Sequence, residues 1–497
     1  MLLIRNANII DGTGKPSYKG DIFVAGDKVS AIGAFPNKKA DVVIDALGLT
    51  VTPGFIDVNN DSDHHLALLT HPSQDDFLKQ GITTIIGGHC GSSLAPLLYG
   101  SLESIRKWAN PDLINVNWHW VSEFFRTIEK QGIGVNFGTL VGHSTIRRAI
   151  IGEDHRDLTD KELNVAEHVV ERSLKEGALG LSTGLGYAHA VLTPYAEIRA
   201  LVKIVARYNG VYSTHLRDEQ SGVEASVAET IRLAEETKAR TLISHLRPLI
   251  GFEPQVARAV KTIHALPDTV DLHFDLYPFG TSYVPVYTLL PAWAKRGNLE
   301  SMLGTVNAAM HRGKLREGLV PVALEHIVIA KSPGSDYLVG KTLGGFAASR
   351  EMDVRDALFE LMTMTRMRAV VLIDNINKGI AERMVFEPRA FVATNSASLP
   401  PGNSALEPER AKETFTRFLE LARIMPPSLF ERAIEKITAI PAKTFRLTGR
   451  GIIKQGSYAD LVCLDGANVA HTILNGRLAV KDGAVTPALL GRVLRRG

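Results

Sequence analysis

The feature that most constrains the fold of this chain is a long central stretch in which short apolar segments alternate with amphipathic helical patterns. Apolar residues recur at helical spacing over 160–175 and again over 223–237. Strands separated by helices pair in parallel and are buried on both faces, which accounts for their continuous apolar character. The predicted strands are 54–58, 84–87, 135–140, 180–183, 211–215, 241–245, 272–276 and 391–394. This α/β pattern predicts a closed (β/α)8 barrel of the TIM type, since a doubly wound sheet rarely needs so many repeats.

The two ends of the chain contain short strands of a different kind. Apolar runs such as 2–4, 21–24 and 42–44 are separated by turn residues, and the C-terminal run 471–474 leads into a hairpin signal, Asn475-Gly476. We therefore expect one small β-sandwich domain that is built from both termini. The predicted domains are the N-terminal part of the β-sandwich at 1–52, the barrel at 53–438, and the C-terminal part of the β-sandwich with the tail at 439–497.

Charge and cysteine content exclude several classes of partner. The chain has 56 basic and 53 acidic residues and a net charge of +3, which is too balanced to indicate nucleic acid or an anionic membrane. No apolar run reaches the length of about 18 residues that a membrane span requires. Two cysteines and an N-terminus that resembles a strand more than a signal peptide favour the cytoplasm. We expect a small-molecule substrate, and a homo-oligomer is left open.

Several of the predicted strands end in residues that bind metals or transfer protons. Barrel enzymes place their chemistry at the carboxyl ends of the strands, where the following loops meet. Core packing alone does not explain why histidine occurs repeatedly at that position. The strand-end residues are Asp57 to Asp61, His89, Cys90, His143, His215, His245, Asp275 and Asn395.

A series of short motifs occurs along the chain in a fixed order. The segment 52–58 closes the first strand of the barrel, and Gly88-His89-Cys90-Gly91 follows the second. Further motifs lie at 142–147, 181–187, 214–219, 243–245, 275–279 and 456–462. Together they resemble the amidohydrolase superfamily and, within it, the N-acyl-D-amino-acid deacylases or D-aminoacylases, whose second motif reads Gly-Asn-Cys-Gly. The resemblance implies an amidohydrolase-type enzyme that acts on linear amide C–N bonds, with the region 53–438 as its metal-dependent barrel.

The resemblance also implies a zinc ion that is held by one cysteine and two histidines. The matching positions are Cys90, His215 and His245. Thiolate and neutral imidazole are good zinc ligands, and three protein ligands leave one coordination position open. Taken singly, each residue has a plainer interpretation, as a buried inert thiol or a core histidine. Three of them at the strand ends of one barrel favour a metal, and we expect one zinc ion.

Two elements of the family's active site are replaced. The superfamily's His-x-His segment, which holds a second metal, reads Asn59-Asn60-Asp61 here. The family's catalytic aspartate lies after the last strand in a Ser-Asp-Gly-Leu-Pro context, and alignment on Leu-Pro places Ala397 at its position. Alanine cannot carry a proton to the leaving amine. We expect Asp61 and His89 to supply the acid/base chemistry, and the alternative for Asp61 is a solvated loop.

The substrate end of the family's site is better retained. The family holds the substrate carboxylate with a basic residue, a tyrosine and an arginine, and the matching residues are Arg247, Tyr277 and Arg410. Arginine suits a carboxylate because its guanidinium donates two parallel hydrogen bonds. For Arg410 the alternative is a solvated helix residue, because acidic residues flank it.

Two functions are therefore compatible with the sequence. The first is a zinc-dependent amide hydrolase of the deacylase type, which acts on a small N-acyl amino acid or a related amide that bears a carboxylate. The second is a divergent homologue without ordinary hydrolase activity. That homologue would be a metal-free binding or scaffold protein, or it would catalyse another reaction on a related substrate, such as amide-bond formation or elimination.

Overall fold

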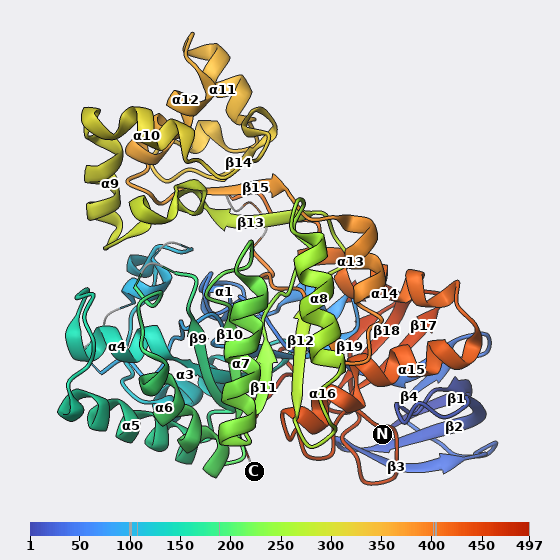
Figure 1. The fold of residues 1–497 in the computed structure, drawn as a ribbon. Coiled ribbons are helices and arrows are strands. Elements are labelled where there is room, and N and C mark those ends of the chain that lie inside the picture. The colour runs from blue at the N-terminus through green and yellow to red at the C-terminus, as the bar shows by residue number, and fades with distance from the viewer. Residues whose placement is uncertain (99–101, 107, 188, 401, 403–404, 497) are drawn as a thin grey trace.

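The centre of the molecule is a parallel barrel. The computed structural model describes residues 1–98, 102–106, 108–187, 189–400, 402 and 405–496. The barrel strands, in spatial order, are β6 (Phe55–Asp57), β7 (Ile82–Gly87), β8 (Asn136–Gly142), β9 (Gly180–Gly184), β10 (Val211–His215), β11 (Arg240–Ile243), β12 (Leu272–Leu276) and β16 (Ala390–Val392). Just beyond the two outer strands, the N–H of Asn395 donates to the carbonyl of Asn59 over 2.9 Å. The sheet is thus nearly closed, and the predicted (β/α)8 barrel is confirmed (Figure 1).

Amphipathic helices surround the barrel. The two helices expected from their spacing have the predicted bounds, α5 (Asp160–Lys175) and α7 (Val223–Thr237). The helix α5 begins at Thr159, whose side chain accepts from the N–H of Glu162 in a capping box. The other outer helices are α3 (Val121–Gln131), α4 (His143–Ile151), α6 (Tyr195–Arg207), α8 (Glu253–His264), α13 (Lys378–Met384), α14 (Arg410–Arg423), α15 (Pro427–Ile437) and α16 (Ala439–Thr444). None of the helices in the described part of the chain combines the length and apolar character that crossing a membrane requires.

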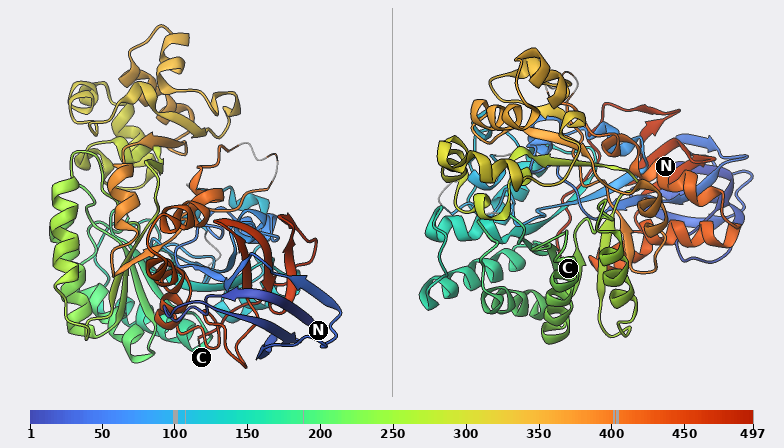
Figure 2. Two further views of the ribbon diagram at one scale, coloured as in Figure 1. Left: turned by 90° about the vertical axis from the view of Figure 1, so that its right-hand side faces the viewer. Right: turned by 45° about the horizontal axis from the view of Figure 1, so that its top comes forward.

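Both termini contribute to one β domain, as predicted. Its strands are β1 (Leu2–Ile9), β2 (Tyr18–Ala25), β3 (Lys28–Gly33), β4 (Val42–Asp45), β5 (Thr50–Pro53), β17 (Leu461–Asp465), β18 (Asn468–Leu474), β19 (Arg477–Lys481) and β20 (Ala484–Val485). The termini meet where β5 pairs antiparallel with β17, and Val51 lies opposite Cys463. In Figure 2 the blue and red strands of the two ends lie side by side. Both Val51 and Cys463 belong to the apolar core of this domain, which fixes it next to the start of β6.

A further unit, which the sequence pattern did not reveal, is inserted between β12 and β16. It contains a three-stranded antiparallel sheet with its own apolar core. Its elements are β13 (Thr281–Pro285), α9 (Leu299–Asn307), α10 (Arg312–Glu317), β14 (Val328–Lys331), α11 (Leu343–Ser349), α12 (Val354–Met364) and β15 (Val370–Asp374). Because β13 follows the carboxyl end of β12 almost directly, this insertion stands over the carboxyl ends of the barrel strands (Figure 1).

Candidate active site

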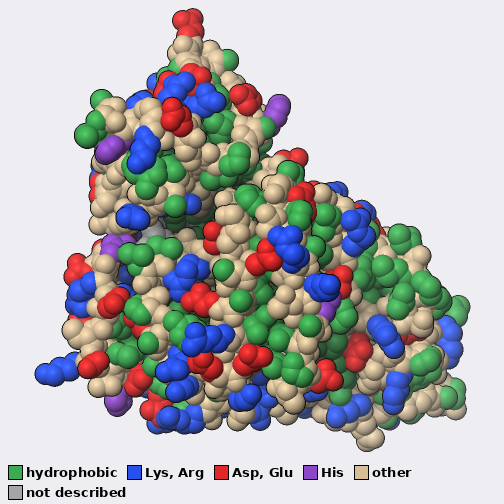
Figure 3. All heavy atoms as spheres, in the orientation of Figure 1, with side chains coloured by type: hydrophobic (Ala, Val, Ile, Leu, Met, Phe, Trp, Pro, Cys, Tyr) green, Lys and Arg blue, Asp and Glu red, His purple; other side chains and the backbone are tan. Residues whose placement is uncertain are grey.

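A cavity of about 740 Å³ lies between the barrel and the insertion. The hollow between the upper lobe and the body of the molecule is visible in Figure 3. Its barrel side is polar and includes the strand-end residues Asp61, Cys90, His215 and His245. Its insertion side is mostly apolar over 283–285, 288–292 and 318–322, and it also includes Lys295 and Arg296. The structure therefore places the candidate chemistry on the barrel and a mostly apolar wall opposite to it.

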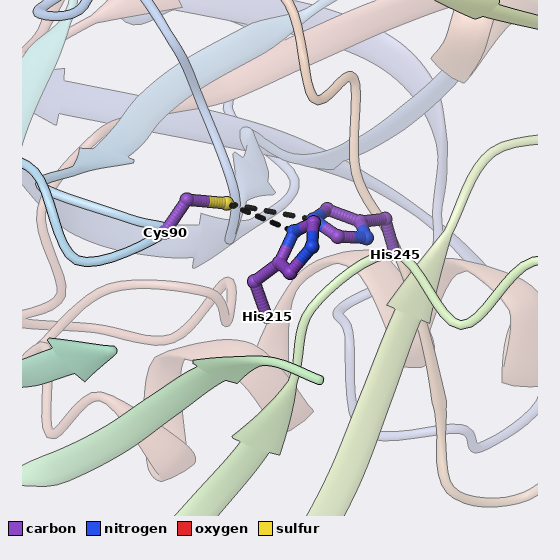
Figure 4. Close-up of side chains that lie close together, drawn as sticks. All are labelled: Cys90, His215 and His245. Carbon is purple, nitrogen blue, oxygen red and sulfur yellow. Dashed lines mark hydrogen bonds between the residues drawn. The ribbon is translucent and has the colours of Figure 1, made fainter. Parts of the chain in front are cut away.

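Cys90, His215 and His245 meet at the barrel side of this cavity (Figure 4). The Nδ1 atom of His215 lies 2.9 Å from Nε2 of His245. The Sγ atom of Cys90 lies 3.4 Å from Nε2 of His245 and 4.0 Å from Nδ1 of His215. Cys90 follows β7, His215 ends β10 and His245 follows β11, so three separate strand ends bring one ligand atom each to a common point.

The backbone at two of these positions is held in an uncommon conformation. Cys90 has φ of 51° and His245 has φ of 40°, in the left-handed region that non-glycine residues rarely adopt. Such residues persist only where the surrounding structure fixes them, and they gather at functional sites. Here Gly88 fixes the approach to Cys90, because a Cβ at Gly88 would lie 2.1 Å from the carbonyl oxygen of Leu140. The turn thereby directs the thiol into the cavity.

The three residues fit a zinc ion. One thiol and two imidazoles are a preferred donor set, and zinc bonds of about 2.3 Å to sulfur and about 2.0–2.1 Å to nitrogen place tetrahedral ligand atoms roughly 3.3–3.6 Å apart. The measured separations of 2.9 to 4.0 Å bracket this range. The ligand atoms of Cys90, His215 and His245 are therefore close enough together to hold one ion.

An ion pair between buried His64 and partly buried Asp61 lies on the same side of the cavity. The Oδ1 atom of Asp61 is 3.1 Å from Nδ1 of His64, and Nε2 of His64 is 3.1 Å from the carbonyl oxygen of Ser92. Burial opposes ionisation of Asp61, but the hydrogen bond and charge of His64 outweigh it and hold the pKa of Asp61 well below its usual range. Burial also opposes charge on His64, yet Asp63 and Asp61 raise its pKa to about 9. At neutral pH the cavity wall thus carries a carboxylate beside an imidazolium.

The loop after the last barrel strand presents Asn395 to the cavity. Its Nδ2 atom donates to Oδ2 of Asp61 over 3.3 Å, and the residue lines the cavity. Ala397, which alignment on Leu-Pro places at the family's aspartate position, packs instead against Ala67 and Leu399. The carboxylate at this point of the cavity therefore comes from the loop after β6, and the loop after β16 supplies an amide that contacts it.

Asn59, at the first position of the segment that corresponds to the superfamily's His-x-His, supports the loop that carries His245. The Nδ2 atom of Asn59 lies 3.2 and 3.1 Å from the two carboxylate oxygens of Asp275. Asp275 also accepts from the backbone N–H of His245 over 2.9 Å. Burial raises the pKa of Asp275 to about 6, although these donors and the His245 side chain oppose the rise. Asn59 is therefore part of the scaffold that fixes the strained backbone at His245.

His89, the second residue expected to do acid/base chemistry, lies behind the cavity wall. Its ring is fully buried, and its Nδ1 atom is 3.1 Å from Oγ of Ser213, which in turn is 2.9 Å from Oγ of Ser244. Burial lowers the pKa of His89 to about 3, so the ring is neutral at physiological pH. His89 is not among the residues that line the cavity, and its contacts bind the Cys90 loop to β10.

Of the three residues expected to bind a carboxylate, Arg247 and Arg410 line the cavity, and Tyr277 contacts Arg410. The guanidinium carbon of Arg410 is 4.6 Å from the ring centre of Tyr277, and Nη2 of Arg247 donates to Glu219 over 2.6 Å. Arg410 is buried and donates to the backbone carbonyls of Thr394 and Asn395, so it is not a solvated helix residue.

Three buried donors in this region have no hydrogen-bond partner among the described residues. They are Nε of Arg247 and the hydroxyls of Tyr277 and Tyr283. Buried polar groups are almost always satisfied in native proteins, so a group of unsatisfied donors beside a cavity indicates a ligand that accepts hydrogen bonds. Tyr283 was missed in the sequence, because it belongs to β13 and only the insertion brings it to the cavity. Glu219 was missed as a separate site residue, although it ends the 214–219 motif.

Comparison with known proteins extends the likeness over the whole chain. No protein-family model matches the chain. A D-aminoacylase of Alcaligenes xylosoxydans xylosoxydans is 29% identical over 100% of this chain and 97% of that protein. An N-acyl-D-aspartate deacylase of the same organism is 28% identical, over 95% of this chain and 86% of that protein.

Solved structures give the same result. The N-acyl-D-glutamate deacylase of Bordetella bronchiseptica, crystallised with zinc and a phosphonate inhibitor that mimics the tetrahedral intermediate, superposes with a TM-score of 0.80 at 25% identity. That superposition covers 99% of each chain. The predicted resemblance to the N-acyl-D-amino-acid deacylases is confirmed: the chain is similar to amidohydrolase-type enzymes over its whole length.

Proposed function

We propose that this protein is a zinc-dependent deacylase that hydrolyses the amide bond of a small N-acyl amino acid, or of a related amide that bears a carboxylate. The observation that carries the proposal is the meeting of Cys90, His215 and His245 within reach of one ion, on the cavity wall that also carries Asp61. The full-length relatives act on N-acyl-D-amino acids by name, which supports the same class of substrate.

Cys90, His215 and His245 would hold the zinc ion. Bound there, zinc supplies Lewis-acid activation of the amide carbonyl and of a water molecule. The protein itself contributes an apolar wall to the cavity, because the insertion lies opposite the proposed ligands. An apolar wall lowers the local dielectric constant and so strengthens the charge interactions that the residues next to it make with the reacting amide.

Asp61 is the proposed proton carrier. A general base must be able to reach the attacking water, and the carboxylate of Asp61 lines the cavity. In the forward reaction its carboxylate accepts a proton from the water and then returns it to the nitrogen of the leaving amine. His64 and Asn395 hold the carboxylate in place through one contact on each of its oxygens.

The unsatisfied donors next to the cavity are the proposed site for the substrate carboxylate. Arg247 provides charge and a free Nε–H, while Tyr277 and Tyr283 provide free hydroxyls. Arg410 adds a second positive charge against the ring of Tyr277. Charge-assisted hydrogen bonds of this kind are stronger than neutral ones, so the site favours a substrate whose amide lies close to a carboxylate.

The test combines metal analysis with a substrate panel. Purified protein is expected to contain one zinc ion per chain and to hydrolyse members of a panel of N-acyl D- and L-amino acids. Cys90→Ala should lose both zinc and turnover. Cys463→Ala is the matched control, because its thiol is buried in the terminal β domain. Absence of zinc after reconstitution, or full turnover by Cys90→Ala, would contradict the proposal; binding of panel members without hydrolysis would favour the divergent homologue instead.

A further inference from the structure

We propose that Glu219 couples the metal ligands to the arginine that binds the substrate carboxylate, so that one side chain controls both metal affinity and substrate affinity. The inference rests on the proposed function and deepens it. Glu219 lies four residues after His215, in the loop at the carboxyl end of β10. Its side chain is 19% exposed, and it reaches across the cavity wall to β11.

The carboxylate of Glu219 contacts three functional residues at once. Its Oε1 atom lies 2.9 Å from Nδ1 of His245. Its Oε2 atom lies 2.6 Å from Nη2 of Arg247 and 3.8 Å from Nε2 of His215. No other carboxylate in the described part of the chain is paired with two of these residues.

The contact with His245 fixes which ring nitrogen binds the metal. A carboxylate at Nδ1 keeps the proton on that atom, which leaves Nε2 with its lone pair free. Nε2 is the atom of His245 that faces Cys90 and His215. Glu219 is therefore a positioning residue for the metal: it acts through His245 and makes the ring a stronger ligand.

The contact with Arg247 has the opposite effect on the substrate. The side chain of Arg247 is only 9% exposed, and its charge is already balanced by Glu219 in a direct ion pair. A substrate carboxylate that reaches the free Nε of Arg247 must share the guanidinium with Glu219 and is repelled by its negative charge. Glu219 thus strengthens zinc binding and weakens the binding of an anionic substrate. Removal of its charge should therefore lower both kcat and KM.

The experiment uses the full-length protein and Glu219→Gln, which keeps the size of the side chain and removes its charge. Zinc affinity is measured by competition with a chromogenic chelator, and steady-state kinetics are measured at saturating zinc with the best N-acyl amino acid of the panel. We expect zinc affinity to fall about 10- to 100-fold, the loss typical of such supporting partners. We expect kcat to fall as well, and KM to decrease several-fold because Arg247 is released.

Two further variants keep the result interpretable. Glu229→Gln is the matched control, since Glu229 pairs with Arg217 over 2.8 Å and contacts no proposed metal ligand. It should leave zinc affinity, kcat and KM unchanged. Glu219→Asp keeps the charge but shortens the reach, and it is judged by the same measurements if the glutamine variant does not fold. The ligand-field bands of the cobalt(II)-substituted protein should shift in both Glu219 variants and stay unchanged in Glu229→Gln.

The outcomes separate this inference from the proposed function. Wild-type protein without zinc binding or hydrolysis contradicts the proposed function itself. An active zinc enzyme in which Glu219→Gln keeps wild-type zinc affinity, or shows a higher KM, overturns the coupling and leaves the deacylase proposal standing.

Discussion

Asn395 donates a hydrogen bond from Nδ2 to Oδ2 of Asp61 over 3.3 Å, and so joins the loop after the last barrel strand to the loop after the first. The two residues are 334 positions apart in the chain. Together with His64, Asn395 leaves the Asp61 carboxylate little freedom to rotate. A carboxylate held in this way at the cavity wall has a fixed position before substrate binds, which is what its proposed role as a general base requires.

Asp61→Asn tests the proposed proton carrier. We expect kcat/KM to fall roughly 10²- to 10⁴-fold, the contribution typical of a positioned acid/base group, because the amide cannot accept a proton. Zinc content should be unchanged, since Asp61 is not a proposed ligand. Asp76→Asn is the control: Asp76 bonds Ser398 near the same end of the barrel but does not line the cavity. Equal activity of the two variants would remove Asp61 from the mechanism.

The raised pKa of His64 makes part of the stability depend on pH. The pKa is about 9 in the folded protein, against an ordinary value of 6.5. A raised pKa means that the charged ring stabilises the fold fully below pH 6.5 and loses this contribution as pH rises through about 9. The difference in unfolding free energy between wild type and His64→Gln should therefore shrink between pH 6.5 and 9.5, measured by urea denaturation. If the difference in unfolding free energy grew with pH, the pKa of His64 would not be raised in the folded protein.

Tyr283→Phe tests the carboxylate site. Its hydroxyl has no partner among the described residues, so its removal should not lower the melting temperature, whereas KM should rise about 10- to 100-fold through loss of a charge-assisted hydrogen bond. Tyr212→Phe is the opposite case, because that hydroxyl is 2.8 Å from Oγ1 of Thr183. We expect Tyr212→Phe to cost about 0.5–1.5 kcal/mol of stability and to leave KM unchanged. If KM of Tyr283→Phe equals that of wild type, the hydroxyl does not contact substrate.

Asp460→Ala tests the junction between the terminal β domain and the barrel. Asp460 pairs with the buried Arg450 and also accepts from Nδ2 of Asn136 on β8 over 3.1 Å. Its loss leaves Arg450 buried without a counter-ion, which costs about 3–5 kcal/mol. Thermal denaturation should show a much lower midpoint for Asp460→Ala than for Asp482→Ala, a change at an exposed carboxylate. Similar midpoints for the two variants would contradict the structural role.

Much of the fold was predictable because its signals are local. The helices at 160–175 and 223–237 have the bounds that their apolar spacing indicated. The insertion was not predictable in the same way. Its helices and strands carry the same periodicity as barrel elements, and nothing in the local pattern of 281–374 states that they pack on a separate core.

The candidate site also has a part that local sequence signals predict and a part that they do not. Cys90, His215 and His245 were expected to lie together because each comes at the end of a strand, and parallel barrel strands end at one rim. The resemblance to the family then singled them out as metal ligands among the strand-end residues. That geometry does not say which way a side chain turns behind the rim. His89 turns to Ser213 inside the barrel, while its neighbour Cys90 faces the cavity.

The sequence by itself determined the barrel, the β domain from both termini and the place of Cys90, His215 and His245 at strand ends, because periodicity and strand-end position are properties of neighbouring residues. The proposed ligand role of these three residues and the replacement of the superfamily's histidines came from the resemblance of the motifs to the family. Only the tertiary structure decided that Asn395 meets Asp61, that Tyr283 reaches the cavity from the insertion, and that Glu219 contacts both His245 and Arg247. These contacts join segments that are far apart in the chain or depend on the rotation of single side chains. Their energies arise from distances in space, and the order of residues does not encode such distances locally.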